Sequence, residues 1–298
     1  MQDTEYAHLT GRIRGMEARM LSMGQLGRMA EAATPADLFR QLAETDYRPA
    51  AEAQDIGMVD QVLGGVYAEI RALSPHPAPV DLFEWDRRFA VARARVRRRE
   101  PLNGELPAEV ADGVRDLVAQ GLPIHVVDTR LDQERFRLMA GSAGATGSEF
   151  LRDLVALWAD LTNLQAMLRA KLLGRRSAFL TGKLVPGGRE AEVFLRAIGE
   201  AWEQLPRLFA GTGEERVAAR AAEEAVREGA LPSLGKTVDD ALTGFARAAR
   251  RVAMGPEAVS GHLWGREVEA RNLRLIFQGV TLGVGPEQIR GRLREPYA

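Results

Sequence analysis

One short element occurs twice in this sequence, and the repeat limits the possible folds more than any other feature. The stretches "DLTNLQAMLRAK" from Asp160 and "EARNLRLIFQGV" from Glu269 both contain an acid, two spacers, Asn-Leu and a run with helical period. Helical spacing puts Asn163 and Asn272 on the same face as apolar neighbours, so each amide is expected inside an apolar stripe. The pattern therefore predicts a chain built from repeated helical units.

A fainter copy, "DRRFAVARARVRRR", begins at Asp86 and has Phe89 where the asparagine would stand. A trace of a fourth, "TGRIRGM", begins at Thr10. The acids are separated by 74 residues (86 to 160) and by 109 residues (160 to 269). This spacing is too uneven for a regular solenoid, so we expect a closed or quasi-symmetric arrangement of about three units.

The repeated acid and asparagine have two interpretations. Residues three apart on a helix touch, so Asp160 is expected to accept from Asn163, and Glu269 from Asn272. A buried amide that is hydrogen-bonded can fix the register between helices, which favours a structural latch. The alternative is direct contact with a partner protein.

Helical period dominates the rest of the chain. An apolar seam of alternating three- and four-residue steps, from Tyr6 to Met23, predicts one amphipathic N-terminal helix. The only strand-like run, "LPIHVVDT" at 122–129, is too short and isolated to seed a sheet. We therefore expect an all-α fold. Its three similar helical-bundle domains are expected at 1–104, 105–188 and 189–298, and the N-terminal helix belongs either to the first or packs with the last.

Bulk composition narrows the class of protein. The 298 residues carry a net charge of −1, which gives no general attraction to nucleic acid. There is no cysteine, so disulfide and thiolate chemistry are excluded, and an intracellular site is favoured. No window approaches the roughly 18 apolar residues of a membrane span, and the start lacks the pattern of a secretory signal.

An arginine-rich run, "DRRFAVARARVRRRE", is the strongest local charge feature. Its candidate partner-facing residues are Arg87, Arg88, Arg95, Arg98 and Arg99. Such a face could grip an acidic protein surface or lipid headgroups. A solvated face whose arginines have intramolecular partners is the competing interpretation.

Catalytic motifs are weak or incomplete. "GALPSLGKT" at 229–237 resembles a nucleotide-binding loop, but it has one residue too many before Gly-Lys-Thr and follows a helical stretch instead of a strand. Glu5 and His8 form one Glu-x-x-His, whereas a di-iron bundle needs two. We therefore expect no catalytic residue, no metal and no cofactor. An enzyme using Lys236 to bind nucleotide is the least favoured hypothesis.

The end of the chain, "REVEARNLRLIFQGVTLGVGPEQIRGRLREPYA", resembles the C-terminal signature of a known family. That family is the C subunit of the prokaryotic V-type (A/V-type) ATP synthases, related to the d subunit of eukaryotic vacuolar ATPases. "GPEAVSGHLWGRE", "YAHLTGRIRGMEARML" and "LAETDYRPA" are similar to its other segments. Thr10 stands where the family usually has asparagine.

The resemblance implies a funnel-shaped, all-helical subunit of three similar domains around a pseudo-threefold axis. It implies a non-catalytic rotor part that links the central stalk to the membrane proteolipid ring and transmits torque for ATP-coupled ion transport. Its partners would be central-stalk subunits and that ring, at the cytoplasmic face of the cell membrane, with no nucleic acid. The alternative function is a helical-repeat adaptor that binds an acidic protein through the arginine-rich helix.

Overall fold

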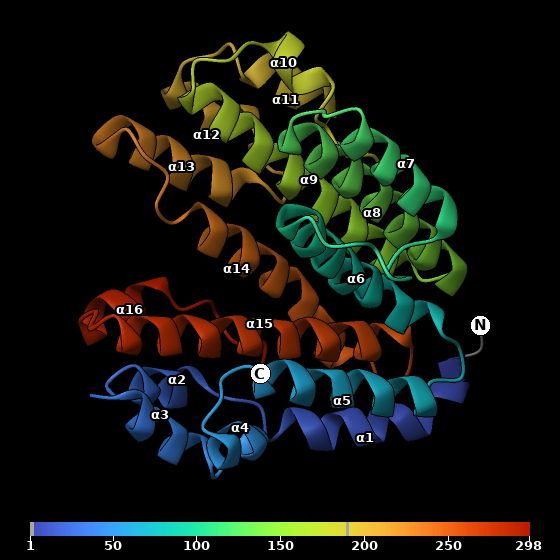
Figure 1. The fold of residues 1–298 in the computed structure, drawn as a ribbon, viewed down its shortest axis with the longest axis vertical. Coiled ribbons are helices and arrows are strands. Elements are labelled where there is room, and N and C mark those ends of the chain that lie inside the picture. The colour runs from blue at the N-terminus through green and yellow to red at the C-terminus, as the bar shows by residue number, and fades with distance from the viewer. Residues whose placement is uncertain (1–2, 189–190) are drawn as a thin grey trace. The chain divides into compact units, whose positions relative to one another are not determined.

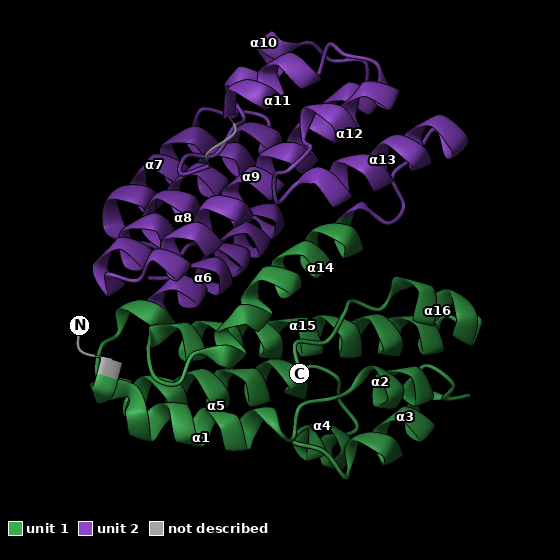
Figure 2. Ribbon diagram, turned by 180° about the vertical axis from the view of Figure 1, so that it is seen from behind, with its two compact units in different colours: residues 1–80, 235–298 green, residues 81–234 purple. Residues whose placement is uncertain are grey.

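Two compact units make up the chain. The computed structural model describes residues 3–188 and 191–298, and within those ranges every regular element is a helix (Figure 1). Unit 1 comprises Met1–Val80 with Gly235–Ala298, and unit 2 comprises Asp81–Leu234 (Figure 2). The chain leaves unit 1 within α6 (Ala78–Arg98) and returns to it at the start of α14 (Leu234–Ala246).

The all-α expectation is confirmed. The division into three similar domains at 1–104, 105–188 and 189–298, and their pseudo-threefold arrangement, remain predictions.

Unit 1 is built around one long helix. Besides parts of α6 and α14, its elements are η1 (Asp3–Tyr6), α1 (Ala7–Glu17), α2 (Met23–Met29), α3 (Pro35–Leu42), α4 (Arg48–Ala53), α5 (Met58–Leu73), η3 (Arg247–Arg251), α15 (Pro256–Thr281) and α16 (Pro286–Arg292). Every residue of α15 from Ala258 to Ala270 is buried, and α1, α5, α3, α2 and α16 all pack on it (Figure 1). A helix that is buried all round forms the core of its unit.

The N-terminal seam is divided between two helices, so the prediction of one helix from Tyr6 to Met23 is wrong. Helix α1 ends at Glu17, and α2 begins after Ser22, whose side chain caps it together with Gln25. The backbone N–H of Leu21, between them, donates to the carboxylate of Glu269 on α15. This contact from a distant part of the chain occupies a donor in the break between the helices, and local periodicity cannot reveal it.

The C-terminal residues lie along α15. Tyr297 is fully buried, and a Cβ added at Gly265 would stand 2.8 Å from the Cβ of Tyr297. A Cβ at Gly279 would likewise meet Ile289 of α16 at 2.7 Å. These glycines therefore let the returning chain approach the helix axis closely.

Unit 2 centres on an antiparallel helix pair. Its other elements are α7 (Ala108–Ala119), α8 (Ile124–Thr146), α9 (Glu149–Leu172), α10 (Ser177–Thr181), α11 (Ala191–Ala197), η2 (Trp202–Gln204), α12 (Leu205–Leu208) and α13 (Glu215–Glu228). Helices α8 and α9 pack along each other and meet at Gly147, whose φ of +73° suits glycine. Ser148 then caps α9 by accepting from Leu151 N–H at 3.3 Å.

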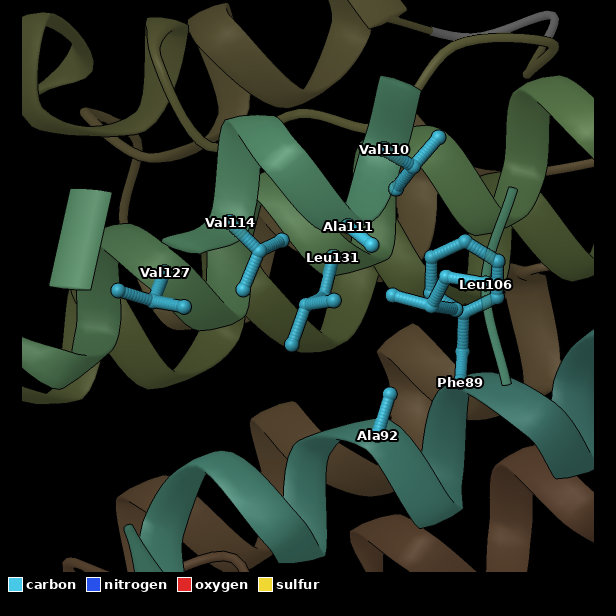
Figure 3. Close-up of a cluster of buried hydrophobic side chains, with 8 residues drawn as sticks. All are labelled: Phe89, Ala92, Leu106, Val110, Ala111, Val114, Val127 and Leu131. Carbon is cyan, nitrogen blue, oxygen red and sulfur yellow. The ribbon is translucent and has the colours of Figure 1, made fainter. Parts of the chain in front are cut away.

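A compact apolar cluster joins α6 to α7 and α8. It consists of Phe89, Ala92, Leu106, Val110, Ala111, Val114, Val127 and Leu131 (Figure 3). Val127 comes from the strand-like run at 122–129, most of which forms the start of α8. Discounting that run as a strand was therefore correct, because tertiary packing overrides the β preference of its residues.

Candidate functional site

The most polar part of the core surrounds Glu269 on α15. Its buried carboxylate accepts from Leu21 N–H, from the Tyr47 hydroxyl at 3.0 Å and from Arg266 Nη1 at 2.9 Å. Arg266 is only 2% exposed, and its Nη2 also reaches Asp46 at 2.6 Å. The Arg266–Glu269 pair lies within α15. Its further bonds join this helix to Leu21, between α1 and α2, and to Asp46 and Tyr47, just before α4.

The protonation states of this cluster are fixed by its neighbours. Burial opposes the charge on Arg266, but the carboxylates of Glu269 and Asp46 hold the pKa of its guanidinium above the ordinary value. Burial raises the pKa of Glu269, against the pull of Arg266 and its other two donors, and raises the pKa of Tyr47 well above its ordinary value. The Glu269 carboxylate has three donors, and both terminal nitrogens of Arg266 are bonded, although its Nε has no hydrogen-bond partner. We interpret this buried pair as structural.

The two repeated asparagines make the same contact. Asn163 Nδ2 donates to the carbonyl of Val185 at 3.2 Å, and its Oδ1 accepts from Val185 N–H at 2.8 Å. Asn272 does the same with Arg294, at 3.0 Å and 2.9 Å. In both cases the partner lies 22 residues further along the chain. Each amide therefore holds the segment that returns along its own helix.

This geometry corrects one expectation. Asn272 was expected to bond to Glu269, yet its two amide hydrogen bonds go to the backbone of Arg294, and the Glu269 carboxylate is held by other donors. The amide of Asn163 likewise donates to Val185 instead of Asp160. The reason is that a returning backbone offers a donor and an acceptor together, which a primary amide matches with both of its atoms.

The acids of the repeated element have different surroundings. Asp86 forms an ion pair with Arg135. Asp160 is buried against the backbone at Gly188, where an added Cβ would collide with its carboxylate. Phe89, in the asparagine position of the third copy, packs in the apolar cluster of Figure 3. That all these residues form one repeated motif remains a prediction.

The arginine-rich helix is largely neutralised inside its own unit. Arg88 donates to the carbonyls of Glu105 and Gly104, and Arg95 pairs with the Glu105 carboxylate at 2.5 Å. Outside the predicted set, Arg93 pairs with Asp132 and Arg97 with Asp128.

The remaining predicted arginines differ in exposure. Arg87 is half-buried and has an interaction of its own. Arg98 and Arg99 are exposed, and their side chains make no hydrogen bond or ion pair with the described residues. Whether any of the five faces a partner remains a prediction, and these two are the free cations among them.

The weak catalytic motifs do not assemble into a site. Lys236 pairs with Asp240 one helical turn on, at 2.5 Å, in the early turns of α14. Glu5 contacts His76 at 3.0 Å, and His8 is exposed. Among residues 3–188 and 191–298, no three His, Asp or Glu side chains cluster as metal ligands would.

One buried histidine was not predicted from the sequence. His262 is fully buried on α15, and neither ring nitrogen has a hydrogen-bond partner. Burial, reinforced by the nearby charges of Arg266, Arg14 and Arg19, lowers its pKa to about 3. The ring is therefore neutral at physiological pH.

The cluster around Arg266 and Tyr47 was also missed. A signal existed, because Arg266 stands three residues before Glu269, which is pairing distance on a helix. Nothing in the sequence points to Asp46 and Tyr47, which lie more than 200 positions away.

A search of the described ranges for membrane-spanning helices finds no helix with the length and hydropathy that a span requires.

Comparison with known proteins adds a specific match. The model of the family described as "ATP synthase (C/AC39) subunit" matches residues 9–83 and 106–292. Two archaeal relatives align over nearly the whole chain. The C subunit of the A-type ATP synthase of Pyrococcus horikoshii is 24% identical over 98% of this chain and 91% of its own length. That of Methanocaldococcus jannaschii is 23% identical over 97% and 86%.

A bacterial relative is also similar. The C subunit of the V-type sodium ATPase of Enterococcus hirae is 26% identical over 65% of this chain, and the match spans 60% of that protein. All three names denote one component of a larger ATPase or ATP synthase.

Proposed function

Because the chain belongs to the ATP synthase (C/AC39) subunit family, we propose that it is the rotor subunit that links the central stalk to the membrane proteolipid ring of a V-type ATP synthase/ATPase. In this role it catalyses nothing itself and transmits torque for ATP-coupled ion transport. It sits at the cytoplasmic face of the cell membrane as a peripheral part of the complex.

The proposal depends on the family match. The matched residues cover most of both chain segments of unit 1 and most of unit 2. The core of unit 1 supports it. A part that transmits torque has to resist deformation, and α15 is tied to distant segments by the Arg266–Glu269 pair and by the Asn272 contacts with Arg294. Buried polar groups that are hydrogen-bonded to distant segments rigidify a core.

The adaptor hypothesis has less support. It relies on a basic face open to a partner, but Arg88 and Arg95 are engaged within unit 2. Reversing Arg95, Arg98 and Arg99 to glutamate should abolish the binding of the supposed partner, with the fold retained, if the adaptor hypothesis holds.

Co-purification from membranes tests the proposal. A tagged chain, solubilised in mild detergent, should bring down central-stalk and proteolipid subunits in fixed ratio. Recovery of the chain alone, or with unrelated proteins only, would count against it. A second measurement asks for coupling: membranes that lack this protein should lose ATP-driven ion pumping, while the detached head keeps hydrolysing ATP.

A further inference from the structure

An apolar groove lies in unit 2 between the last turn of α6, the loop that follows it and α7. It has a volume of about 680 Å³. Its apolar lining consists of Val96, Pro101, Leu102, Val114, Val118 and Ala119. Arg99, Glu100 and Arg115 also line it. We call this feature the α6–α7 groove.

The apolar stripe of α7 extends beyond the core that covers it. Val114 is 1% exposed and belongs to the apolar cluster shown in Figure 3. Val118, one turn further, is 50% exposed, and Leu122, just past the helix, is 37% exposed. The groove is thus an outward continuation of the core, and an exposed apolar surface of this kind is typical of a protein contact site.

The α6 side of the groove carries free positive charge. Arg98 and Arg99 are exposed and unpaired among the described residues, whereas the neighbouring Arg95 and Arg97 are held by carboxylates of unit 2. The free acids of α7, such as Asp116, point to the opposite side of that helix by their spacing from Val118. Glu100, which also lines the groove, lies 3.8 Å from Arg95 Nη1. The surface therefore combines an apolar floor with one free cation in its lining, Arg99, and a second, Arg98, next to it in the sequence.

The backbone at Arg99 is also unusual. Its φ is +59°, a left-handed conformation that costs free energy for any residue with a Cβ. Helices α9 and α15 end in the same conformation, but there the residues are Gly174 and Gly283, with φ of +65° and +66°. Among the described residues, Gln54 at the end of α4 is the other non-glycine residue with this conformation, and of the two only Arg99 lines the groove.

We propose that the α6–α7 groove docks an amphipathic helix of a partner protein, its apolar stripe over Val118 and its carboxylates against Arg98 and Arg99. A groove between helices suits the apolar face of another helix, and the free arginines select an acidic one. Residues 84–105 fall between the two segments matched by the family model, so the basic edge is not part of the family pattern. The inference rests on the proposed function only in naming the partner as another subunit of the same complex.

Two synthetic helices probe the groove in the purified full-length chain. They share one leucine stripe, and one carries glutamates beside it where the other carries lysines. We expect the glutamate peptide to bind more tightly by fluorescence anisotropy. Arg98→Glu with Arg99→Glu should weaken it about tenfold, because each reversal replaces an exposed attraction with a comparable repulsion. Equal affinity for the two peptides would overturn the proposal.

Matched variants separate the groove from the general surface. Val118→Asp should abolish peptide binding, while Val91→Asp should not, since Val91 is similarly exposed at 47% but lies outside the groove. Arg207→Glu serves as the charge control, because Arg207 is exposed in the same unit and lacks a described partner. Circular dichroism melts establish that each variant is folded. If the controls weaken binding as much as the groove variants do, the proposal fails.

Cross-linking in the assembled complex identifies the occupant. A photoreactive amino acid at position 118 should capture a helical segment with acidic residues from another subunit. Capture of lipid, of this chain itself or of nothing overturns the proposal, even when the stalk and ring subunits co-purify and the proposed function stands. If the glutamate peptide binds selectively but those subunits do not co-purify, the groove is upheld and the rotor role fails.

Discussion

Replacing each buried asparagine by leucine tests whether these amides hold the returning segments. Asn163→Leu and Asn272→Leu keep a side chain of similar size but remove both hydrogen bonds to the backbone 22 residues on. Each substitution leaves one backbone N–H and one carbonyl without their partner. The cost therefore depends on whether water can reach those two groups.

The two sites differ in that respect. Val185 is 5% exposed, so both of its groups stay unpaired, at a cost of about 1–3 kcal/mol each. The leucine returns part of this through apolar burial, which leaves a net loss of about 2–4 kcal/mol. Arg294 is half-exposed, so water replaces some of the lost bonding, and about 1–2 kcal/mol is expected there.

Urea denaturation gives the free energies, and hydrogen exchange locates them. The tryptophans allow the units to be followed separately, since Trp264 is in unit 1 and the other three are in unit 2. The amide protons of Val185 and Arg294 should exchange faster in the respective variants. Asn103→Leu, on the loop after α6, is the control and should change stability by less than about 0.5 kcal/mol.

Two results would refute this reasoning. A loss at Asn272→Leu greater than that at Asn163→Leu would show that backbone burial does not set the cost. Losses below about 0.5 kcal/mol at both sites, with unchanged amide exchange, would show that the paired contacts do not hold the segments at all.

Three further substitutions follow from the same structure. Arg266→Met should lower the free energy of unfolding, measured in urea, by about 3–5 kcal/mol because the Glu269 carboxylate stays buried without its cation. Adding Glu269→Gln to this variant should restore part of the loss. His262 has a pKa of about 3 when folded, below its ordinary 6.5, so only the unfolded chain takes up that proton between these values. The free energy of unfolding therefore falls as the pH drops from 6.5 toward 3. His262→Leu should reduce the slope of this fall by about 1.4 kcal/mol per pH unit. Parallel pH profiles for the two proteins would contradict this. Arg99→Gly should stabilise the fold by about 0.5–1 kcal/mol in thermal melts by relieving the left-handed residue, while Arg98→Gly, inside the helix, should destabilise it; the reverse order would remove the case for strain at Arg99.

Helical class and the burial of the repeated asparagines were predictable because both depend on local spacing. Asn163 and Asn272 sit on apolar stripes that can be read directly, and both are fully buried. Their hydrogen-bond partners were not predictable, because Val185 and Arg294 lie on returning segments whose path depends on the fold. Periodicity identifies a buried face without identifying what covers it.

Two helix boundaries and one charge pattern show the same limit. The seam through Met20 continues with helical spacing although the helix has ended, since Leu21 N–H is held by Glu269. The small-residue run at 141–147 is typical of a loop, yet α8 continues to Thr146, where buried Ala143 packs in the core. In the arginine-rich helix, the neutralising carboxylates of Asp128 and Asp132 come from another helix. Tertiary contacts decided all three cases.

Unit 1 is assembled from the two ends of the chain, with unit 2 inserted between them. The Leu21–Glu269 contact closes a loop of 248 positions, so α1 cannot pack on the core helix of its unit until α15 has been synthesised. During translation the apolar face of α1 stays exposed while the whole of unit 2 is synthesised. In that period this face can aggregate or bind chaperones. Because unit 2 is a compact unit of continuous sequence, we expect it to complete its own packing in that time. A chain that ends between residues 235 and 255 contains all of unit 2 but lacks α15, so we expect it to have a folded unit 2 and an unfolded N-terminal segment.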